Sequence, residues 1–162
     1  MVDLLMEWGG TLIVFFAAAI AVVFPGFGSA RGVGLVGQAA AGLISEDPSK
    51  FSKVLILQAL PGTQGLYGFL TTILLLNKTG ILSGDMAPID LSMGLKYLFA
   101  VLPITVVGYF SAVIQAKTSA AGVAIVTKQP EDSTKAIIFA AMVETYAVIS
   151  LLSSLLMIFS IE

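Results

Sequence analysis

The chain has 162 residues, of which 57% are hydrophobic and 11% are charged, with a formal net charge of −2. A mean hydropathy of +1.00 excludes an ordinary soluble domain and indicates an integral membrane protein. Because cysteine and histidine are absent, disulfides, thiolate or imidazole metal sites and histidine-based catalysis are excluded. The slightly acidic charge balance offers no basic face for nucleic acid.

Four apolar segments follow one another along the chain. Residues before the first segment carry acids where a signal peptide carries lysine or arginine, so we expect that segment to be retained as a membrane helix. Backbone amides in lipid must bond within their own segment, which predicts helices rather than strands. The prediction is an all-α protein with a single membrane domain, residues 1–162, whose helical segments cover residues 10–44, 51–76, 94–126 and 135–161.

The connections between these segments differ in kind. Residues 45–50 and 128–135 are short, proline-containing and charged, whereas residues 77–93 form a longer connection containing glycine and proline. Four lysines lie in or beside the short turns, against two near the long connection. Because lysine favours the cytoplasmic side, we expect both short turns in the cytoplasm and both termini on the opposite side of a cell membrane.

The two halves of the chain are similar to each other. A shift of about 82 residues superimposes them without a gap through both charged turns, and this register makes chance similarity an unsatisfactory explanation. The sequence therefore predicts two tandem helical hairpins, residues 10–76 and 94–161, in the same orientation. The matched pairs include Gly26 with Gly108, Ser29 with Ser111, Pro48 with Pro130, Lys53 with Lys135, and Thr63 with Thr145.

Glu144 interrupts the fourth apolar segment near its middle. A carboxylate in hydrocarbon costs at least about 3 kcal/mol, so it requires a partner. Counted from the charged turns at about 1.5 Å per residue, Glu144, Gln115 and Gln64 lie at similar depth, about 20 Å from the turns. In the first hairpin, Gly62 occupies the position of Glu144.

The second segment carries oxygen donors on one face. Leu60, Thr63, Gln64 and Tyr67 follow the spacing i, i+3, i+4 and i+7. The proline and glycine between them should kink or loosen the helix, which can free the backbone carbonyl of Leu60. Tyr67 is predicted to donate a hydrogen bond to the acid rather than to bind an ion directly.

These oxygens predict a cation site. Its ligands would be the Glu144 carboxylate, the side-chain oxygens of Gln115, Gln64 and Thr63, and the Leu60 carbonyl, because hard cations take oxygen ligands. One negative charge fits a monovalent ion, and the additional neutral oxygens favour Na⁺ over H⁺. The first alternative is a site that carries H⁺.

Other interpretations remain open. The amides and hydroxyl could simply join helices while Glu144 stays protonated, as in a structural oligomer. A small secondary transporter acting alone is another alternative. Residues 32–37 match the dinucleotide-binding fingerprint, but they lie inside an apolar segment with no strand before it, which argues against cofactor binding.

Three motifs carry a resemblance that covers essentially the whole chain. They are Leu-Gln-Ala-Leu-Pro-Gly-Thr-Gln-Gly-Leu-Tyr-Gly at residues 57–68, Phe-Ser-Ala-Val-Ile-Gln-Ala-Lys at residues 110–117, and Ile-Ile-Phe-Ala-Ala-Met-Val-Glu-Thr-Tyr-Ala at residues 137–147. In these motifs the chain resembles the proteolipid K subunit, a duplicated rotor-ring proteolipid, of bacterial sodium-translocating V-type ATPases.

The resemblance implies the same five Na⁺ ligands, with Tyr67 bonded to Glu144. It also implies a rotor ring of identical copies in lipid, turned by ATP hydrolysis in partner subunits, with no catalysis in this chain. A stator membrane subunit would supply an arginine that helps release the ion, and the charged turns would bind a central-stalk subunit.

Overall fold

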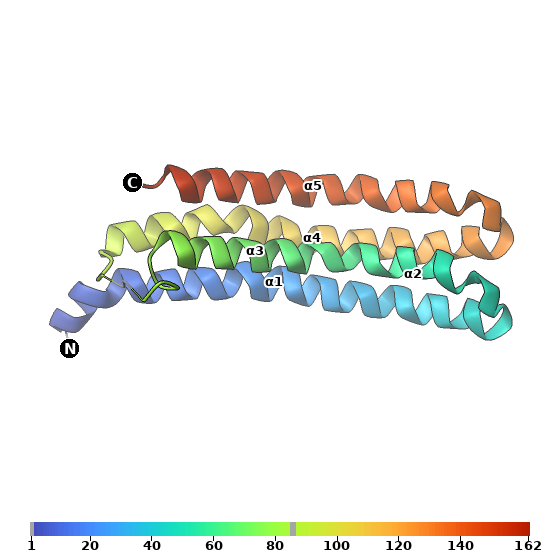
Figure 1. The fold of residues 1–162 in the computed structure, drawn as a ribbon, viewed down its shortest axis with the longest axis horizontal. Helices are drawn as coiled ribbons and strands as arrows, with labels where there is room; N and C mark the ends of the chain where they lie inside the picture. Colours follow the sequence, from blue (N-terminus) through green and yellow to red (C-terminus); the bar gives the residue numbers. More distant parts are fainter. Residues whose placement is uncertain (1, 85–86) are drawn as a thin grey trace.

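Four long helical stretches make up the structure, a computed structural model that describes residues 2–84 and 87–162 (Figure 1). Within these ranges there is no strand, so the predicted all-α class is confirmed. Each stretch is long and apolar enough to cross a membrane. The α-helices are α1 (Val2–Glu46), α2 (Phe51–Ala59), α3 (Thr63–Lys78), α4 (Leu91–Lys128) and α5 (Ser133–Ser160).

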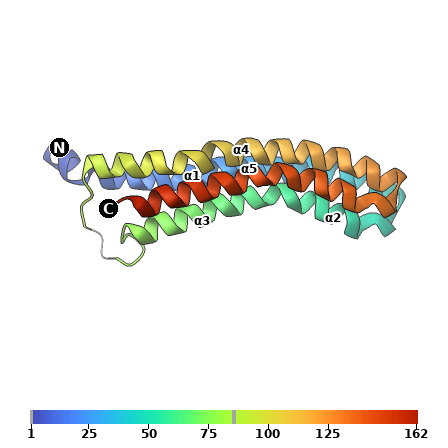
Figure 2. The ribbon, with the colours of Figure 1, turned by 90° about the horizontal axis from the view of Figure 1, so that it is seen from above.

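The helices form two antiparallel hairpins that lie side by side. In Figure 1, α1 begins and α5 ends at one end of the molecule, and both short turns lie at the other. The main packing contacts join α1 to α4, α4 to α5 and α1 to α3. Figure 2 shows the result, with α1 and α4 together on one side and α2, α3 and α5 on the other.

A single 3₁₀ turn, η2 (Leu60–Gly62), separates α2 from α3. Pro61 has no N–H to donate to the preceding helical turn, so the backbone tightens there instead of continuing as an α-helix. The second membrane crossing is therefore interrupted at the residues where the sequence predicts a loosened helix.

The turn of the second hairpin is bonded to the first hairpin. The two charged turns contain the 3₁₀ turns η1 (Pro48–Lys50) and η3 (Pro130–Asp132). The Asp47 carboxylate accepts hydrogen bonds from the hydroxyl of Ser49 at 2.6 Å and from the N–H of Ser49 at 3.0 Å. These bonds hold the pKa of the Asp47 carboxyl below its usual value. Lys53 Nζ donates to the Pro130 carbonyl at 2.8 Å, which joins the first hairpin to the turn of the second.

The long connection is anchored at the opposite end. The Asp90 carboxylate accepts a hydrogen bond from the N–H of Met93 at 3.0 Å and so caps the start of α4. The N–H of Ile89 donates to the Thr11 hydroxyl at 3.1 Å, which fastens this connection to α1. Gly80 has a φ of 73°, a left-handed backbone conformation that glycine adopts without strain.

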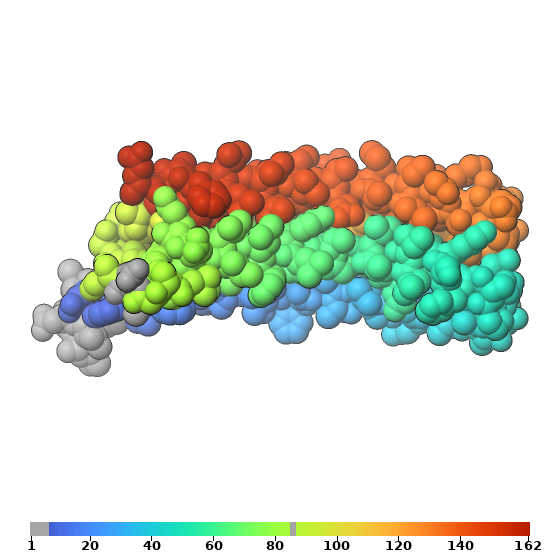
Figure 3. Space-filling view, in the orientation of Figure 1, coloured from blue at the N-terminus to red at the C-terminus, as the bar shows by residue number. Residues whose placement is uncertain are grey.

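The buried interior is divided along its length. One apolar cluster, near the chain ends, includes Val14, Leu75, Tyr97 and Ile158. A second cluster, near the charged turns, includes Val36, Leu57, Val126 and Ala136. The polar residues singled out above, on α3, α4 and α5, lie between these clusters. The outer surface, one face of which appears in Figure 3, carries large exposed apolar side chains such as Leu66, Phe139 and Leu152, as expected for contact with lipid.

Glycine allows α1 and α4 to approach closely. A Cβ atom added at Gly28 would lie 2.8 Å from the Tyr109 carbonyl oxygen and 3.1 Å from the Ala112 Cβ. A Cβ atom at Gly32 would lie 3.1 Å from that of Ala116. Small residues thus bring the two central helices together, as they do in many membrane bundles.

A substitution pair tests this close packing. Gly28→Leu should lower the midpoint of thermal unfolding in detergent micelles, because overpacking of a tight contact costs about 1–3 kcal/mol. Gly42→Leu is the matched control, since nothing lies within 4 Å of a Cβ atom at that helical position. Equal midpoints for the two variants would contradict the close α1–α4 contact.

Candidate functional site

The Glu144 carboxylate receives hydrogen bonds from two neighbouring helices. The Tyr67 hydroxyl on α3 donates to Oε1 at 2.5 Å. Gln115 Nε2 on α4 donates to Oε2 at 3.4 Å. The acid is therefore held between the two hairpins, because Tyr67 belongs to the first and Gln115 to the second.

Two buried amides stand behind the carboxylate. Gln64 and Gln115 are both 0% exposed. Gln64 Nε2 donates to Gln115 Oε1 at 2.5 Å, and Gln115 Nε2 donates to the Ala140 carbonyl at 3.1 Å. This network satisfies the amide donors and leaves the second oxygen, Gln64 Oε1, directed toward Thr63, whose Oγ1 lies 3.4 Å away.

The 3₁₀ turn places two further oxygens beside these amides. The Leu60 carbonyl accepts hydrogen bonds from the N–H of Thr63 and from its hydroxyl at 3.0 Å. The expectation that loosening the helix frees the Leu60 carbonyl is therefore wrong in detail, because this carbonyl accepts hydrogen bonds from Thr63. The Thr63 Oγ1 atom nevertheless lies within 3.4 Å of both Leu60 O and Gln64 Oε1.

All six residues singled out from the sequence belong to one continuous set of contacts. The set runs from the Leu60 carbonyl through Thr63, Gln64 and Gln115 to Glu144 and then Tyr67. The depth count from the turns therefore predicted neighbours correctly across both hairpins. The cluster lies between the two apolar clusters described above.

One contributing residue was missed in the sequence. Ser111 Oγ donates to the Val143 carbonyl at 3.2 Å and accepts from Gln64 Nε2 at 3.4 Å. It lies one helical turn before Gln115 on the same face, so its i, i+4 spacing was the available signal. Its repeat counterpart, Ser29, accepts from the N–H of Gly65 at 2.8 Å.

Glu144 is half-buried, whereas the two amides behind it are fully buried. Glu144 lines a shallow cavity of about 380 Å³ whose remaining walls also come from α5, including Thr145 and Val148. Within residues 2–84 and 87–162, no three Asp, Glu, His or Cys side chains gather as a metal site. The site thus combines one carboxylate with neutral oxygens and has direct access from one face.

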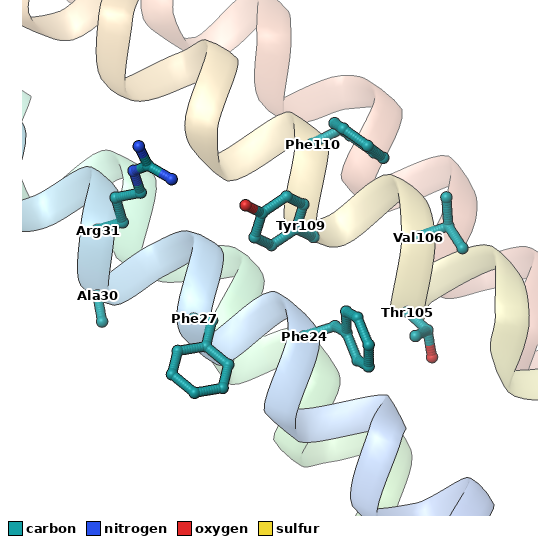
Figure 4. Close-up of a pocket in the computed structure, with 8 residues that line it drawn as sticks. All are labelled: Phe24, Phe27, Ala30, Arg31, Thr105, Val106, Tyr109 and Phe110. Carbon is teal, nitrogen blue, oxygen red and sulfur yellow. The ribbon is translucent and has the colours of Figure 1, made fainter.

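A different cavity, of about 600 Å³, lies between α1 and α4 (Figure 4). The rings of Phe24 and Phe27 from α1 and of Tyr109 and Phe110 from α4 line it, together with Arg31. None of the six site residues lines this cavity. Its aromatic walls are therefore separate from the polar cluster around Glu144.

Comparison with known proteins identifies the architecture. The family of ATP synthase C subunits matches the chain twice, over residues 16–75 and 98–157, so residue 98 corresponds to residue 16 at a shift of 82. The chain is 48% identical over 155 residues to the K subunit of the V-type sodium ATPase of Enterococcus hirae, and the alignment covers 96% of each protein. It is 37% identical over 142 residues to the K subunit of the A-type ATP synthase of Methanocaldococcus jannaschii, covering 87% of this chain and 59% of that relative.

Members of this family are non-catalytic subunits that assemble as rings of identical copies, while ATP hydrolysis takes place in other subunits. The four helices long enough to cross a membrane agree with that assignment. The chain belongs to the family of ATP synthase C subunits and is a multi-pass, non-catalytic membrane protein that carries two tandem copies of the family's domain.

Proposed function

We propose that this chain is the ion-carrying rotor-ring subunit of a V-type ATPase and that it binds Na⁺ at Glu144. The ring would carry the ion across the membrane as ATP hydrolysis in partner subunits turns it. The observation that carries the proposal is the connected cluster of amide, hydroxyl and carbonyl groups that reaches one carboxylate midway along the helices.

The charge of the site supports a monovalent ion. One carboxylate and one Na⁺ sum to zero, whereas a divalent ion would leave excess positive charge in hydrocarbon. The proposed ligands are Glu144, Gln115, Gln64, Thr63 and the Leu60 carbonyl, an all-oxygen set suited to a hard cation. The Enterococcus hirae relative, which is named as part of a sodium ATPase, supports the same ion.

The hydrogen bonds around the site are compatible with ion binding. The Thr63 hydroxyl donates to the Leu60 carbonyl, so its lone pairs can face a cation without loss of that bond. The amide donors of Gln115 are directed to Ala140 and Glu144, so its oxygen faces the interior of the cluster. Tyr67 would hold the carboxylate in position rather than bind the ion.

Rotation requires the site to alternate between lipid and a stator. A loaded site is neutral and can face hydrocarbon, whereas an empty carboxylate cannot do so cheaply. We propose that a stator arginine assists release at the open face of Glu144 and that the charged turns bind a central-stalk subunit. Those turns would be cytoplasmic, with both termini on the opposite side of the cell membrane.

Carbodiimide labelling tests the ion and the acid together. The reagent should modify Glu144 in the assembled ring, and Na⁺ at near-neutral pH should slow that modification severalfold, measured by mass spectrometry of the labelled peptide. The exposed Glu131 serves as the internal control, and Glu144→Gln should abolish labelling at the site. Labelling that is indifferent to Na⁺ would favour a ring that carries H⁺.

A ligand substitution separates Na⁺ from H⁺ more directly. Thr63→Val should weaken Na⁺ protection of Glu144 by about tenfold or more, since about 1.4 kcal/mol is a factor of ten in affinity. The carboxyl itself should remain reactive. Thr127→Val is the matched control, because Thr127 is an exposed residue whose hydroxyl bonds within its own helix, to the Val123 carbonyl at 2.9 Å. Unchanged protection in Thr63→Val would argue against Thr63 as a ligand.

A further inference from the structure

Ser111 belongs to the polar cluster around Glu144 but is not among the proposed ion ligands. We propose that Ser111 is a positioning residue that determines specificity: it orients the Gln64 amide so that the oxygen Oε1, and not the nitrogen Nε2, is presented to the cation. The inference rests on the proposed Na⁺ site, because it explains how that site keeps its neutral oxygens available to a metal ion.

A buried glutamine amide can be placed in two ways. Its oxygen accepts hydrogen bonds and its nitrogen donates two, so a flip of the amide replaces a group that attracts a cation with one that repels it. Gln64 is 0% exposed, and a buried donor without an acceptor is costly. The orientation of Gln64 therefore depends on which acceptors surround its nitrogen.

Ser111 is one of these acceptors, and its partner on α5 fixes that role. Ser111 Oγ donates to the Val143 carbonyl at 3.2 Å. A carbonyl can only accept, so the single hydroxyl proton is directed to it and the lone pairs of Oγ are left to accept. Gln64 Nε2 donates to Oγ at 3.4 Å. Ser111 is 5% exposed, so bulk water does not compete for its hydroxyl.

Gln115 supplies the second acceptor, and α5 orients it in the same way. Its Nε2 donates to the Ala140 carbonyl at 3.1 Å, and its Oε1 accepts from Gln64 Nε2. Both donors of Gln64 thus meet acceptors that main-chain carbonyls of α5 hold in place. A flipped Gln64 would set its oxygen against Gln115 Oε1 and would remove the donor to Ser111.

The opposite side of the Gln64 amide then carries an oxygen that is available to a cation. Thr63 Oγ1 lies 3.4 Å from Gln64 Oε1, but its one proton has a closer acceptor in the Leu60 carbonyl, at 3.0 Å. A cation attracts such an oxygen, whereas a proton bound to Glu144 does not require it. Ser111 therefore acts on the ion through Gln64.

The repeat counterpart of Ser111 holds the same short segment from the other side. Ser29 on α1 accepts from the N–H of Gly65 at 2.8 Å. That N–H lies in the first turn of α3, where the N–H groups lack partners within the helix. Ser29 thus fixes the main chain beside Gln64, and Ser111 on α4 fixes the end of its side chain.

Solid-state NMR of assembled rings in Na⁺-free buffer tests the orientation without any ion. Rings labelled with heavy nitrogen in the glutamine side chains and heavy carbon in serine and threonine should show a stronger dipolar contact from Gln64 Nε2 to Ser111 Cβ than to Thr63 Cβ. The variant Gln64→Leu identifies the signal by removing it. A stronger contact to Thr63 would mean that the amide is flipped and would overturn the inference.

A double-mutant cycle tests the effect on the ion. Ser111→Ala should raise the Na⁺ concentration that half-protects Glu144 from carbodiimide roughly tenfold, because it leaves a buried donor of Gln64 unsatisfied. Gln64→Leu should also raise that concentration, and adding Ser111→Ala to it should have no further effect, since both changes act through one side chain. Ser111→Thr keeps the hydroxyl and should restore protection.

Ser150→Ala is the matched control and should leave Na⁺ protection unchanged. Ser150 is also 5% exposed, but its hydroxyl bonds the Ala147 carbonyl of its own helix at 2.8 Å. Unchanged protection in Ser111→Ala, or additive effects of Ser111→Ala and Gln64→Leu, would overturn the inference. If Na⁺ fails to protect even the unsubstituted ring, the proposed Na⁺ function fails, and the NMR contact decides the orientation of Gln64. The same contact decides if the variants do not assemble.

Discussion

A carboxylate held within a hydrocarbon layer is the constraint on which the rest of the structure depends. Glu144 cannot remain charged and unpartnered there, and each polar group placed beside it must itself be satisfied. The structure meets both demands with one connected cluster. Buried Gln64 and Gln115 bond each other, Ser111 accepts from the first of them, and apolar clusters on both sides confine this polar layer to one depth.

The duplicated hairpin lets one fold serve two purposes. Within the chain, the contact between hairpins is polar and surrounds Glu144. In the first hairpin, Gly62 and Val33 occupy the positions that Glu144 and Gln115 occupy in the second. The same backbone arrangement therefore carries an acid and a buried amide in one hairpin and small or apolar residues at the equivalent positions of the other.

Depth could be predicted from the sequence, but orientation could not. Counting from the charged turns brought Glu144, Gln115 and Gln64 to one level, and Pro61 correctly predicted an interrupted helix. The count contains no information about the rotation of each helix about its own axis. That rotation determines which side chains face one another, and so allows Lys53 to reach the Pro130 carbonyl. It also could not give the direction of each amide or show that the Leu60 carbonyl keeps a hydrogen bond, since both depend on neighbours far along the chain.

The connection between α3 and α4 has a further consequence for assembly. Because it joins two hairpins covalently and is fastened to α1 by the Ile89–Thr11 hydrogen bond, hairpins can enter a ring only in pairs. Any closed ring of intact chains thus contains an even number of hairpins. The circumference of the ring can change only in steps of two hairpins. Each change of ring size is therefore a large change in curvature. This restricts the ring sizes that can close without strain.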